Sequence, residues 1–183
     1  MSLTADISRT CKDSIGGIYT LYVFPYVKYS RTNIITEGQR LTSFPSTTLL
    51  RIDAINVSFN ENSSFEGGSE RWQQNFSFDV PKTKETRQLF QLLKQNYSLI
   101  YTDRLGNNRI LGLYNGLESE ITDESGQERT DFNGYRVTMD GLEDNQAYFI
   151  DDIEDAGFIT GLNFIFENEN NFIFEDNNNF ITQ

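Results

Sequence analysis

Short runs in which every second residue is apolar constrain the fold of this chain more than any other feature. Residues 49–61 and 71–80 both show this alternation, and a turn region with two consecutive glycines lies between them at 62–70. Because successive side chains of a strand point to opposite faces of a sheet, each run can bury one face and expose the other. The two runs therefore predict a β-hairpin.

The same kind of run continues to residue 150. Further strands are predicted at residues 18–30, 97–103, 109–115, 116–122, 134–141 and 147–150. Connections rich in Gly, Asn and Asp separate several of them, and such turns favour antiparallel neighbours. We therefore expect a mainly β fold, an antiparallel β-sandwich or a barrel-like domain.

Only residues 82–95 show the period of a helix. They place Leu89, Phe90 and Leu93 on one side, and Pro81 before them suits a first helical turn. We expect one α-helix to be inserted in the β fold at about 82–95, with this apolar side buried against the sheet.

Composition excludes several kinds of chemistry. The 183 residues include no histidine and a single cysteine, Cys11. Without histidine there is no Ser-His-Asp triad, no Cys-His pair and no His-ligated zinc, and one thiol cannot form a disulfide within the chain. The sequence also has no glycine-rich phosphate loop. We expect no catalytic residues, no metal site and no cofactor.

The sequence gives no sign of export or membrane insertion. Residues 1–17 lack the apolar stretch of a secretory signal, and no apolar run approaches the roughly 20 residues that a membrane helix needs. The single cysteine fits folding in a reducing compartment.

Charge is distributed unevenly along the chain. The formal net charge is −12, yet residues 1–116 carry 13 basic and 10 acidic side chains, whereas residues 117–183 carry 2 basic and 17 acidic ones. This asymmetry is compatible with head-to-tail contacts between copies and equally with a solvated acidic face. The acidic balance argues against tight binding of nucleic acid through its phosphates.

The chain ends in a phenylalanine-rich repeat. The dipeptide Asn-Phe recurs at residues 163, 171 and 179, with acids and asparagines between the apolar groups. One interpretation is a disordered low-complexity tail. The other, which we favour, is a set of short strands that need a partner surface, because so few strands are not stable alone. We divide the chain into a β-rich domain at 1–150 and an acidic linker with the repeat tail at 151–183.

Four features follow one another along the chain: the long segment without a clear period at 30–48, the helix at 82–95, the hairpins up to residue 150, and the run LEDNQAYFID after NGYRVTMDG. The order of these parts resembles the tail-tube proteins of long-tailed bacteriophages, a family that shares its fold with type VI secretion tube proteins. The resemblance covers roughly residues 15–150.

The resemblance implies a non-enzymatic structural protein of the virion that assembles in the host cytoplasm into hexameric rings, which stack as a hollow tube. In that family, strands of neighbouring subunits join into an inner barrel, and viral DNA passes through without tight binding. The long loop reaches the next ring, and here this loop would be Ser30–Thr48, which we expect to make contacts between rings rather than to pack in the core. The side chains expected to contact other subunits are Ile34, Ile35, Leu41, Phe44, Phe164, Phe166, Phe172, Phe174 and Phe180. Other expected partners are tail or neck proteins of the virion, and no membrane.

Other interpretations stay open. Neck, tail-terminator and baseplate ring proteins share the fold of this family, so the chain could occupy one of those positions in the particle. A receptor-binding or glycan-binding surface module is a further alternative. A calcium-binding module would use the oxygen ligands of residues 151–155 or 175–179, but neither run matches an EF-hand loop.

A carboxylate enzyme such as a glycosidase is the alternative from another class. It would need two acids about 5–10 Å apart across a substrate groove. The neighbouring acids in the sequence are Glu118 with Glu120, Asp151 with Asp152, and Glu154 with Asp155. Adjacent acids of this kind are more often solvated charges than catalytic pairs, so we expect no enzyme.

Overall fold

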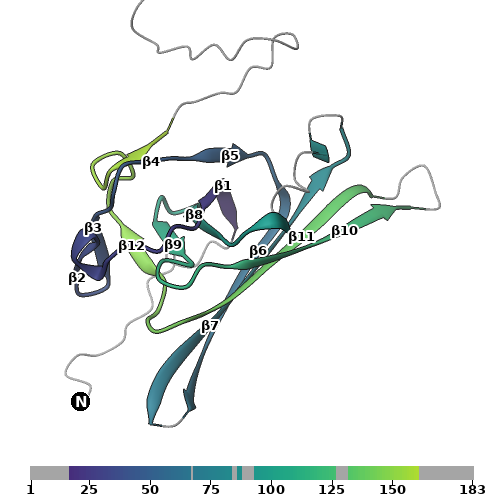
Figure 1. Cartoon of the computed structure of the whole chain (residues 1–183). Helices are drawn as coiled ribbons and strands as arrows, with labels where there is room; N and C mark the ends of the chain where they lie inside the picture. The colour runs from purple at the N-terminus through teal and green to yellow at the C-terminus, as the bar shows by residue number, and fades with distance from the viewer. Residues whose placement is uncertain (1–16, 67, 84–85, 88–92, 127–131, 161–183) are drawn as a thin grey trace, which may run out of the picture.

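The computed structural model describes residues 17–66, 68–83, 86–87, 93–126 and 132–160. In these residues the fold is mainly β, with thirteen strands and short 3-10 turns, of which η1 is the one described in full (Figure 1). The elements in chain order are β1 (Ile18–Pro25), η1 (Arg31–Asn33), β2 (Ile35–Glu37), β3 (Arg40–Ser43), β4 (Thr47–Thr48), β5 (Leu50–Ile52), β6 (Ile55–Glu66), β7 (Ser69–Pro81), β8 (Tyr97–Asp103), β9 (Asn108–Leu111), β10 (Glu118–Ser125), β11 (Asn133–Glu143), β12 (Tyr148–Ile150) and β13 (Phe158–Ile159). The prediction of a mainly β fold is confirmed.

The strands form two large sheets. The seven-stranded sheet has the order β2-β3-β12-β9-β8-β1-β5, and the four-stranded sheet has the order β10-β11-β7-β6. Strands β4 and β13 form a separate pair. The pairs β3–β12 and β4–β13 are parallel and the other described pairs are antiparallel, so these two depart from the antiparallel arrangement that the turns predict.

An apolar core lies between the two large sheets. Side chains of β7 and β11 in the four-stranded sheet meet side chains of β1, β8 and β9 in the seven-stranded sheet. This inter-sheet core contains Leu21, Val23, Ile52, Phe76, Phe78, Val80, Tyr97, Leu99, Tyr101, Leu111, Leu117, Val137, Met139 and Ala147. The apolar residues at every second position of β7 and β11 are therefore the ones whose side chains point into this core.

A second apolar core lies on the opposite face of the seven-stranded sheet. Phe44 and Phe158 stack there with ring centroids 4.9 Å apart, and the ring of Phe24 lies 5.5 Å from that of Phe158. Successive residues of β8 serve the two cores, since Leu99 belongs to the inter-sheet core and Ile100 to the second core. Burial on both faces explains why β8 carries three consecutive apolar residues, Leu99, Ile100 and Tyr101, rather than apolar residues at alternate positions only.

A buried ion pair lies at the edge of the inter-sheet core. Arg109 of β9 donates to Glu61 of β6 at 3.3 Å, and its guanidinium lies over the rings of Phe59 and Phe149 at 5.4 and 4.8 Å. Gln74 of β7 also donates to Glu61 at 3.0 Å. The Arg109–Glu61 pair connects the two sheets, whereas the bond from Gln74 lies within the four-stranded sheet. Removing either Arg109 or Glu61 would leave a buried charge unpaired.

Residues 30–48 pack in the second core, so the expectation that they do no core packing is wrong. Ile34, Leu41 and Phe44 are buried members of that core. The segment contains η1, β2, β3 and β4, and pairing of β3 with β12 holds it against the large sheet. Its strands are two to four residues long, which is too short for an alternating pattern to be visible in the sequence.

Most of the predicted helix, including Leu89 and Phe90, lies outside the described residues. Residues 86–87 and 93–94 have 3-10 conformation, and the described residues contain no α-helix. Leu93 is 48% exposed, so the prediction that it is buried against the sheet is wrong. A 3-10 turn has three residues per turn, and a side chain spaced for the 3.6-residue period then no longer points to the expected side.

The fold continues beyond residue 150, where the sequence predicts a domain boundary. Asp152 accepts hydrogen bonds from the backbone N–H groups of Glu154 and Asp155 at 2.8 and 3.1 Å, and these bonds form a turn. The turn returns the chain to the second core, in which Phe158 is buried. The acidic composition of this segment therefore belongs to a folded turn rather than to an extended linker.

Replacing Leu99 by Ala should lower the free energy of unfolding by about 2–5 kcal/mol, because Leu99 is fully buried and its truncation leaves a cavity in the inter-sheet core. Replacing the half-exposed Leu93 by Ala should cost less than about 1 kcal/mol. Urea denaturation followed by far-UV circular dichroism measures both values. Equal losses at the two positions would contradict the burial described above.

Candidate functional site

The outward face of the four-stranded sheet is a regular polar surface that spans four strands. The register of its strands places alternate residues of β6, β7, β10 and β11 on this side, away from the inter-sheet core. We call it the polar face, and its side chains are Ser58, Asn60, Asn62, Ser64, Arg71, Gln73, Asn75, Ser77, Asp79, Glu118, Glu120, Thr122, Glu124, Arg136, Thr138, Asp140 and Leu142. In this set all except Leu142 are polar, and none is aromatic. The exposed Ile55, which lies opposite Asp79 before the irregularity in β6, is a second apolar residue at this surface.

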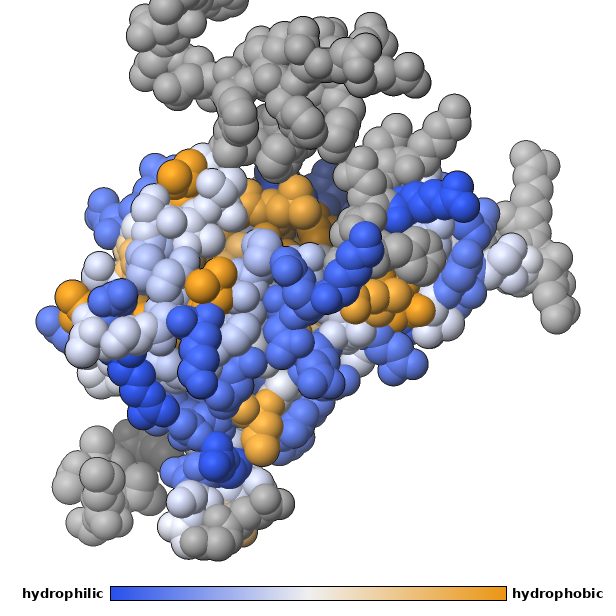
Figure 2. All heavy atoms as spheres, viewed as in Figure 1, coloured by the Kyte–Doolittle hydropathy of each residue, from blue (hydrophilic) through white to orange (hydrophobic). Residues whose placement is uncertain are grey.

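Polar side chains run in rows across the strands. In one row Glu120 lies opposite Thr138, and Thr138 lies opposite Ser77. Ser77 shares a hydrogen bond of 2.8 Å with Ser58 on β6. Figure 2 shows that hydrophilic side chains (blue) also cover most of the molecular surface in the view of Figure 1, with hydrophobic groups in separate patches.

The two cations of the polar face are both paired with carboxylates. Arg136 donates to Asp79 at 3.0 Å and to Glu124 at 2.8 Å, and Arg71 forms an ion pair with Asp144. Burial alone would raise the pKa of Asp79, but hydrogen bonds from Arg136 and Asn56 outweigh this effect and lower the pKa. The cations therefore have little free charge to offer to an anion.

The three remaining carboxylates of the polar face gather at one end of it. Glu118 lies directly opposite Asp140, and Glu120 is the next outward-facing residue of β10. Burial raises the pKa of Asp140, and the negative charge of Glu120 raises it further. Like charges that face each other across strands destabilise a sheet. The polar face thus concentrates negative charge at some cost to the stability of the monomer.

The polar face is bounded by two open strand edges. In the described residues, β10 and β6 are the outer strands of the sheet and pair on one side only. β10 has 8 residues and β6 has 12, so each open edge is long enough to pair with another strand.

One backbone hydrogen bond shows which residues of β10 turn their N–H and C=O groups to its open side. The Gly126 N–H donates to the Phe132 carbonyl at 3.1 Å, so even-numbered residues here bond to β11. Alternate residues of a strand turn their N–H and C=O groups to the same side. The backbone N–H and C=O groups of the odd-numbered residues therefore point to the open side of β10. These residues are Ser119, Ile121, Asp123 and Ser125.

The same reasoning extends across the sheet to β6. The Lys82 N–H donates to the Asn133 carbonyl at 3.1 Å, so even-numbered residues of β7 bond to β11 and odd-numbered ones bond to β6. Odd-numbered residues of β7 lie opposite even-numbered residues of β6, so the even-numbered residues of β6 bond to β7. The backbone N–H and C=O groups of the odd-numbered residues of β6 therefore point to its open side. In the regular part of the strand these are Phe59, Glu61, Ser63 and Phe65.

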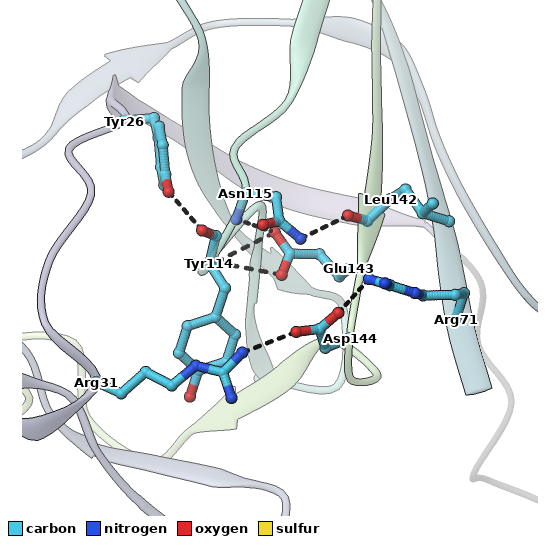
Figure 3. Close-up of polar contacts among 8 residues, drawn as sticks. All are labelled: Tyr26, Arg31, Arg71, Tyr114, Asn115, Leu142, Glu143 and Asp144. Carbon is cyan, nitrogen blue, oxygen red and sulfur yellow. Dashed lines mark hydrogen bonds and ion pairs between the residues drawn. The ribbon is translucent and has the colours of Figure 1, made fainter. Parts of the chain in front are cut away.

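A polar cluster fixes the end of β11 to the connection between the two sheets (Figure 3). The carboxylate of Glu143 accepts hydrogen bonds from the backbone N–H groups of Tyr114 at 3.2 Å and Asn115 at 2.9 Å. The side chain of Asn115 donates in return to the Leu142 carbonyl at 2.8 Å. Because residues 112–117 lead from β9 in one sheet to β10 in the other, these bonds hold the corner of the fold.

Asp144 extends this cluster to two further elements. Its carboxylate forms ion pairs with Arg31 of η1 at 2.7 Å and with Arg71 of β7, as Figure 3 shows. The guanidinium of Arg31 also lies 5.2 Å from the centre of the Tyr114 ring. The cluster therefore sets the position of the polar face relative to the seven-stranded sheet.

All six side chains of the acid pairs considered for catalysis are exposed in the structure. Glu118 and Glu120 lie on the polar face, Asp151 pairs with exposed Arg40, and Asp152 caps the turn after it. The described residues also contain no group of three or more His, Cys, Asp or Glu side chains that could hold a metal ion.

The structure separates the residues predicted to contact other subunits. Ile34, Leu41 and Phe44 are buried in the second core, whereas Ile35 on edge strand β2 is 54% exposed. The other predicted contacts, Phe164, Phe166, Phe172, Phe174 and Phe180, lie outside the described residues. The contact of these side chains with a neighbouring subunit stays a prediction.

Sequence reasoning missed the polar face, although the sequence carries a signal of it. In each alternating run, the apolar positions mark the buried side of the strand. The positions between them are mainly Ser, Asn, Gln, Thr, Asp and Glu. The order of the strands, which brings these positions together on one surface, comes from tertiary pairing.

Comparison with known proteins gives no relative. No family model, no curated protein and no solved structure matches the chain. Among the described residues, none forms a helix of the length and apolar character needed to cross a membrane.

Glu143 should make the stability of the protein depend on pH. Burial raises the pKa of its carboxyl from 4.5 to about 7, although backbone N–H groups of Asn115 and Tyr114 act in the opposite direction. The native state then binds the proton more tightly than the unfolded chain does. This contribution is present in full below about pH 4.5, and it is lost as the pH rises to about 7. The loss should amount to at most about 3 kcal/mol.

Chemical denaturation of the wild type and of Glu143→Gln between pH 4.5 and 8 measures this effect. The difference between their unfolding free energies isolates Glu143 from the other titrating groups. We expect that difference to change by up to about 3 kcal/mol across the range, since Gln has no charge to gain. A difference that is constant with pH would show that Glu143 does not titrate in this window.

Proposed function

We propose that this chain is a non-enzymatic structural protein of a bacteriophage tail, which assembles into hexameric rings that stack as a tube for the passage of DNA. The family resemblance described above suggests this role. The observation that supports it best is the polar face, a surface with surplus negative charge between two open strand edges.

The edges of the four-stranded sheet are suited to joining copies into a ring. All pairs within this sheet are antiparallel, and it has an even number of strands, so β10 of one copy would meet β6 of the next in antiparallel orientation. Such pairing would continue the sheet from copy to copy with the same side always facing inward. A contact of this head-to-tail kind closes into a ring when the rotation between copies permits.

The charge of the polar face is suited to a DNA conduit. Its carboxylates outnumber its guanidinium groups, and both guanidinium groups are engaged by carboxylates. A negative surface repels phosphate, so DNA bounded by such a surface would move without adhering. A conduit also gives a reason for keeping Glu118, Glu120 and Asp140 together in spite of the cost to the monomer.

The remaining surfaces are assigned by the same proposal. The exposed Ile35 on the edge strand β2 would contribute to contacts between rings, and the phenylalanines of residues 161–183 would contact a neighbouring subunit or another tail or neck protein. A neck, tail-terminator or baseplate ring would use the polar face in the same way, so these positions in the particle are the first alternative.

A receptor-binding or glycan-binding surface module is the second alternative. Glycan sites commonly use exposed aromatic rings as stacking surfaces, and the polar face has no aromatic side chain. Trp72, the single tryptophan, lies on the inward-facing phase of β7 opposite Glu143. These features favour a conduit surface over a glycan site.

The pairing of open edges can be tested with proline, which removes a backbone N–H. The N–H of Ser63 faces the open side of β6, so Ser63→Pro should leave the monomer folded while preventing ring formation. Ser63→Ala is the matched control, because it keeps the N–H and should assemble as the wild type does. Analytical ultracentrifugation measures assembly, and circular dichroism measures folding. Normal assembly of a folded Ser63→Pro protein would contradict the role of β6.

The charge of the polar face can be tested by reversing one carboxylate. Glu120→Lys should make the assembled protein bind double-stranded DNA, with an affinity that falls as salt concentration rises, whereas the wild type should not bind detectably. Glu37→Lys, an equal charge change on β2 of the other sheet, is the control and should not bind. Fluorescence anisotropy with labelled DNA measures binding. Equal binding by both variants would mean that the polar face does not meet DNA.

A further inference from the structure

The hairpin of β6 and β7 extends beyond the sheet to which it belongs. β11 pairs with β7 only as far as Trp72, whereas β6 and β7 stay paired beyond this point. Figure 1 shows this end of the hairpin projecting past the other strands. We call residues 64–65 and 69–70 the hairpin tip. Phe65 is 77% exposed there, and it lies opposite Glu70, which is exposed as well.

A second exposed surface carries the opposite charge. The N–H of Tyr26 donates to the carbonyl of Asn96 at 2.9 Å, so the segment that follows β1 lies beside the segment that precedes β8. The exposed apolar and basic side chains of these two segments, which we call the basic patch, are Val27, Lys28, Leu93 and Lys94. In the described part of the chain, neither lysine of the basic patch pairs with a carboxylate.

The basic patch lies at the start of β10, on the side away from β11. The backbone groups of Leu117, the residue before β10, exchange hydrogen bonds of 2.7 and 3.0 Å with those of Tyr97. Odd-numbered residues here turn these groups away from β11, so Tyr97 and the segment before it lie on that side. Gly116 packs against the same place, since a Cβ atom added to it would lie 2.8 Å from Tyr26 and 3.0 Å from Asn96.

We propose that the hairpin tip of one copy docks on the basic patch of the next copy. This inference rests on the proposed function, in which β6 of one copy runs antiparallel to β10 of its neighbour. In an antiparallel pair, the end of one strand lies beside the start of the other. The end of β6 carries the hairpin tip, and it therefore comes to the start of β10, where the basic patch lies.

The two surfaces are complementary in charge and in apolar character. The carboxylate of Glu70 would meet the ammonium groups of the two lysines, and the ring of Phe65 would cover Val27 and Leu93. An aromatic side chain surrounded by polar and charged groups is a common anchor of protein interfaces. Because the hairpin tip and the basic patch are different parts of one chain, the contact is head-to-tail, as ring closure requires.

Sedimentation-velocity ultracentrifugation of the full chain tests the docking of the hairpin tip. Phe65→Ser should weaken assembly roughly tenfold or more, because it removes a central aromatic side chain. Leu105→Ser is the matched control, since Leu105 is 45% exposed at the end of β8 opposite to Tyr97 and its replacement should leave assembly unchanged. Circular dichroism measures the folding of both variants.

Charge reversal tests the partner surface. Glu70→Lys alone, or Lys28→Glu together with Lys94→Glu, should weaken assembly several-fold, because like charges would then meet. A chain that carries all three changes should assemble more tightly than either of these variants, since opposite charges meet again. Weakening without recovery in the combined chain would mean that the hairpin tip binds elsewhere, and this would overturn the assignment to the basic patch.

The same measurements separate this inference from the proposed function. If the wild type assembles and Phe65→Ser assembles equally well, the docking is overturned while the proposed ring stands. If Phe65→Ser weakens assembly and Ser63→Pro does not, the docking is supported while the pairing of β6 with β10 is contradicted. A wild type that stays monomeric would overturn both.

Discussion

The packing of β7 and β11 against β1 and β8 is the interaction on which the rest of the structure depends. This contact buries Phe76, Phe78, Val137 and Met139. One face of β7 and β11 is thereby removed from solvent. Because the side chains of a strand alternate, those at the other positions must then face outward over the whole length of the sheet. The polar face follows from the inter-sheet core, and its regular spacing follows from the strand register.

The polar face and its edges form one surface because the sheet is fixed at its ends. Glu143 and Asp144 connect the end of β11 to the corner between the sheets, to η1 and to β7. Glu61 and Arg109 make a second connection between β6 and β9. A sheet held in this way can present two open edges in a constant relation to each other. Under the proposed function, that relation would decide whether successive copies close into a ring.

Much of the β architecture could be predicted from the sequence, because the long strands have one buried face and one solvated face. The central strand β8 was also predictable from its run of apolar residues. The short strands of residues 30–48 could not be predicted, since their burial depends on pairing with β12, more than a hundred positions away. Leu93 was misplaced because a helical period was assumed where the described residues form 3-10 turns. For the candidate site, the sequence shows the polar residues at alternate positions of the strands. That Glu118 lies opposite Asp140 and that Glu143 is buried follow only from tertiary contacts.

The central claim, that open edges β6 and β10 join copies into a ring with the polar face inward, is tested most directly by cryo-electron microscopy of the purified protein. The account predicts rings or stacked tubes in which β10 of one subunit lies beside β6 of the next, with Glu118, Glu120 and Asp140 lining the central channel. Particles that remain monomeric at high concentration would contradict it. Rings that carry the polar face on their outer surface would contradict it as well.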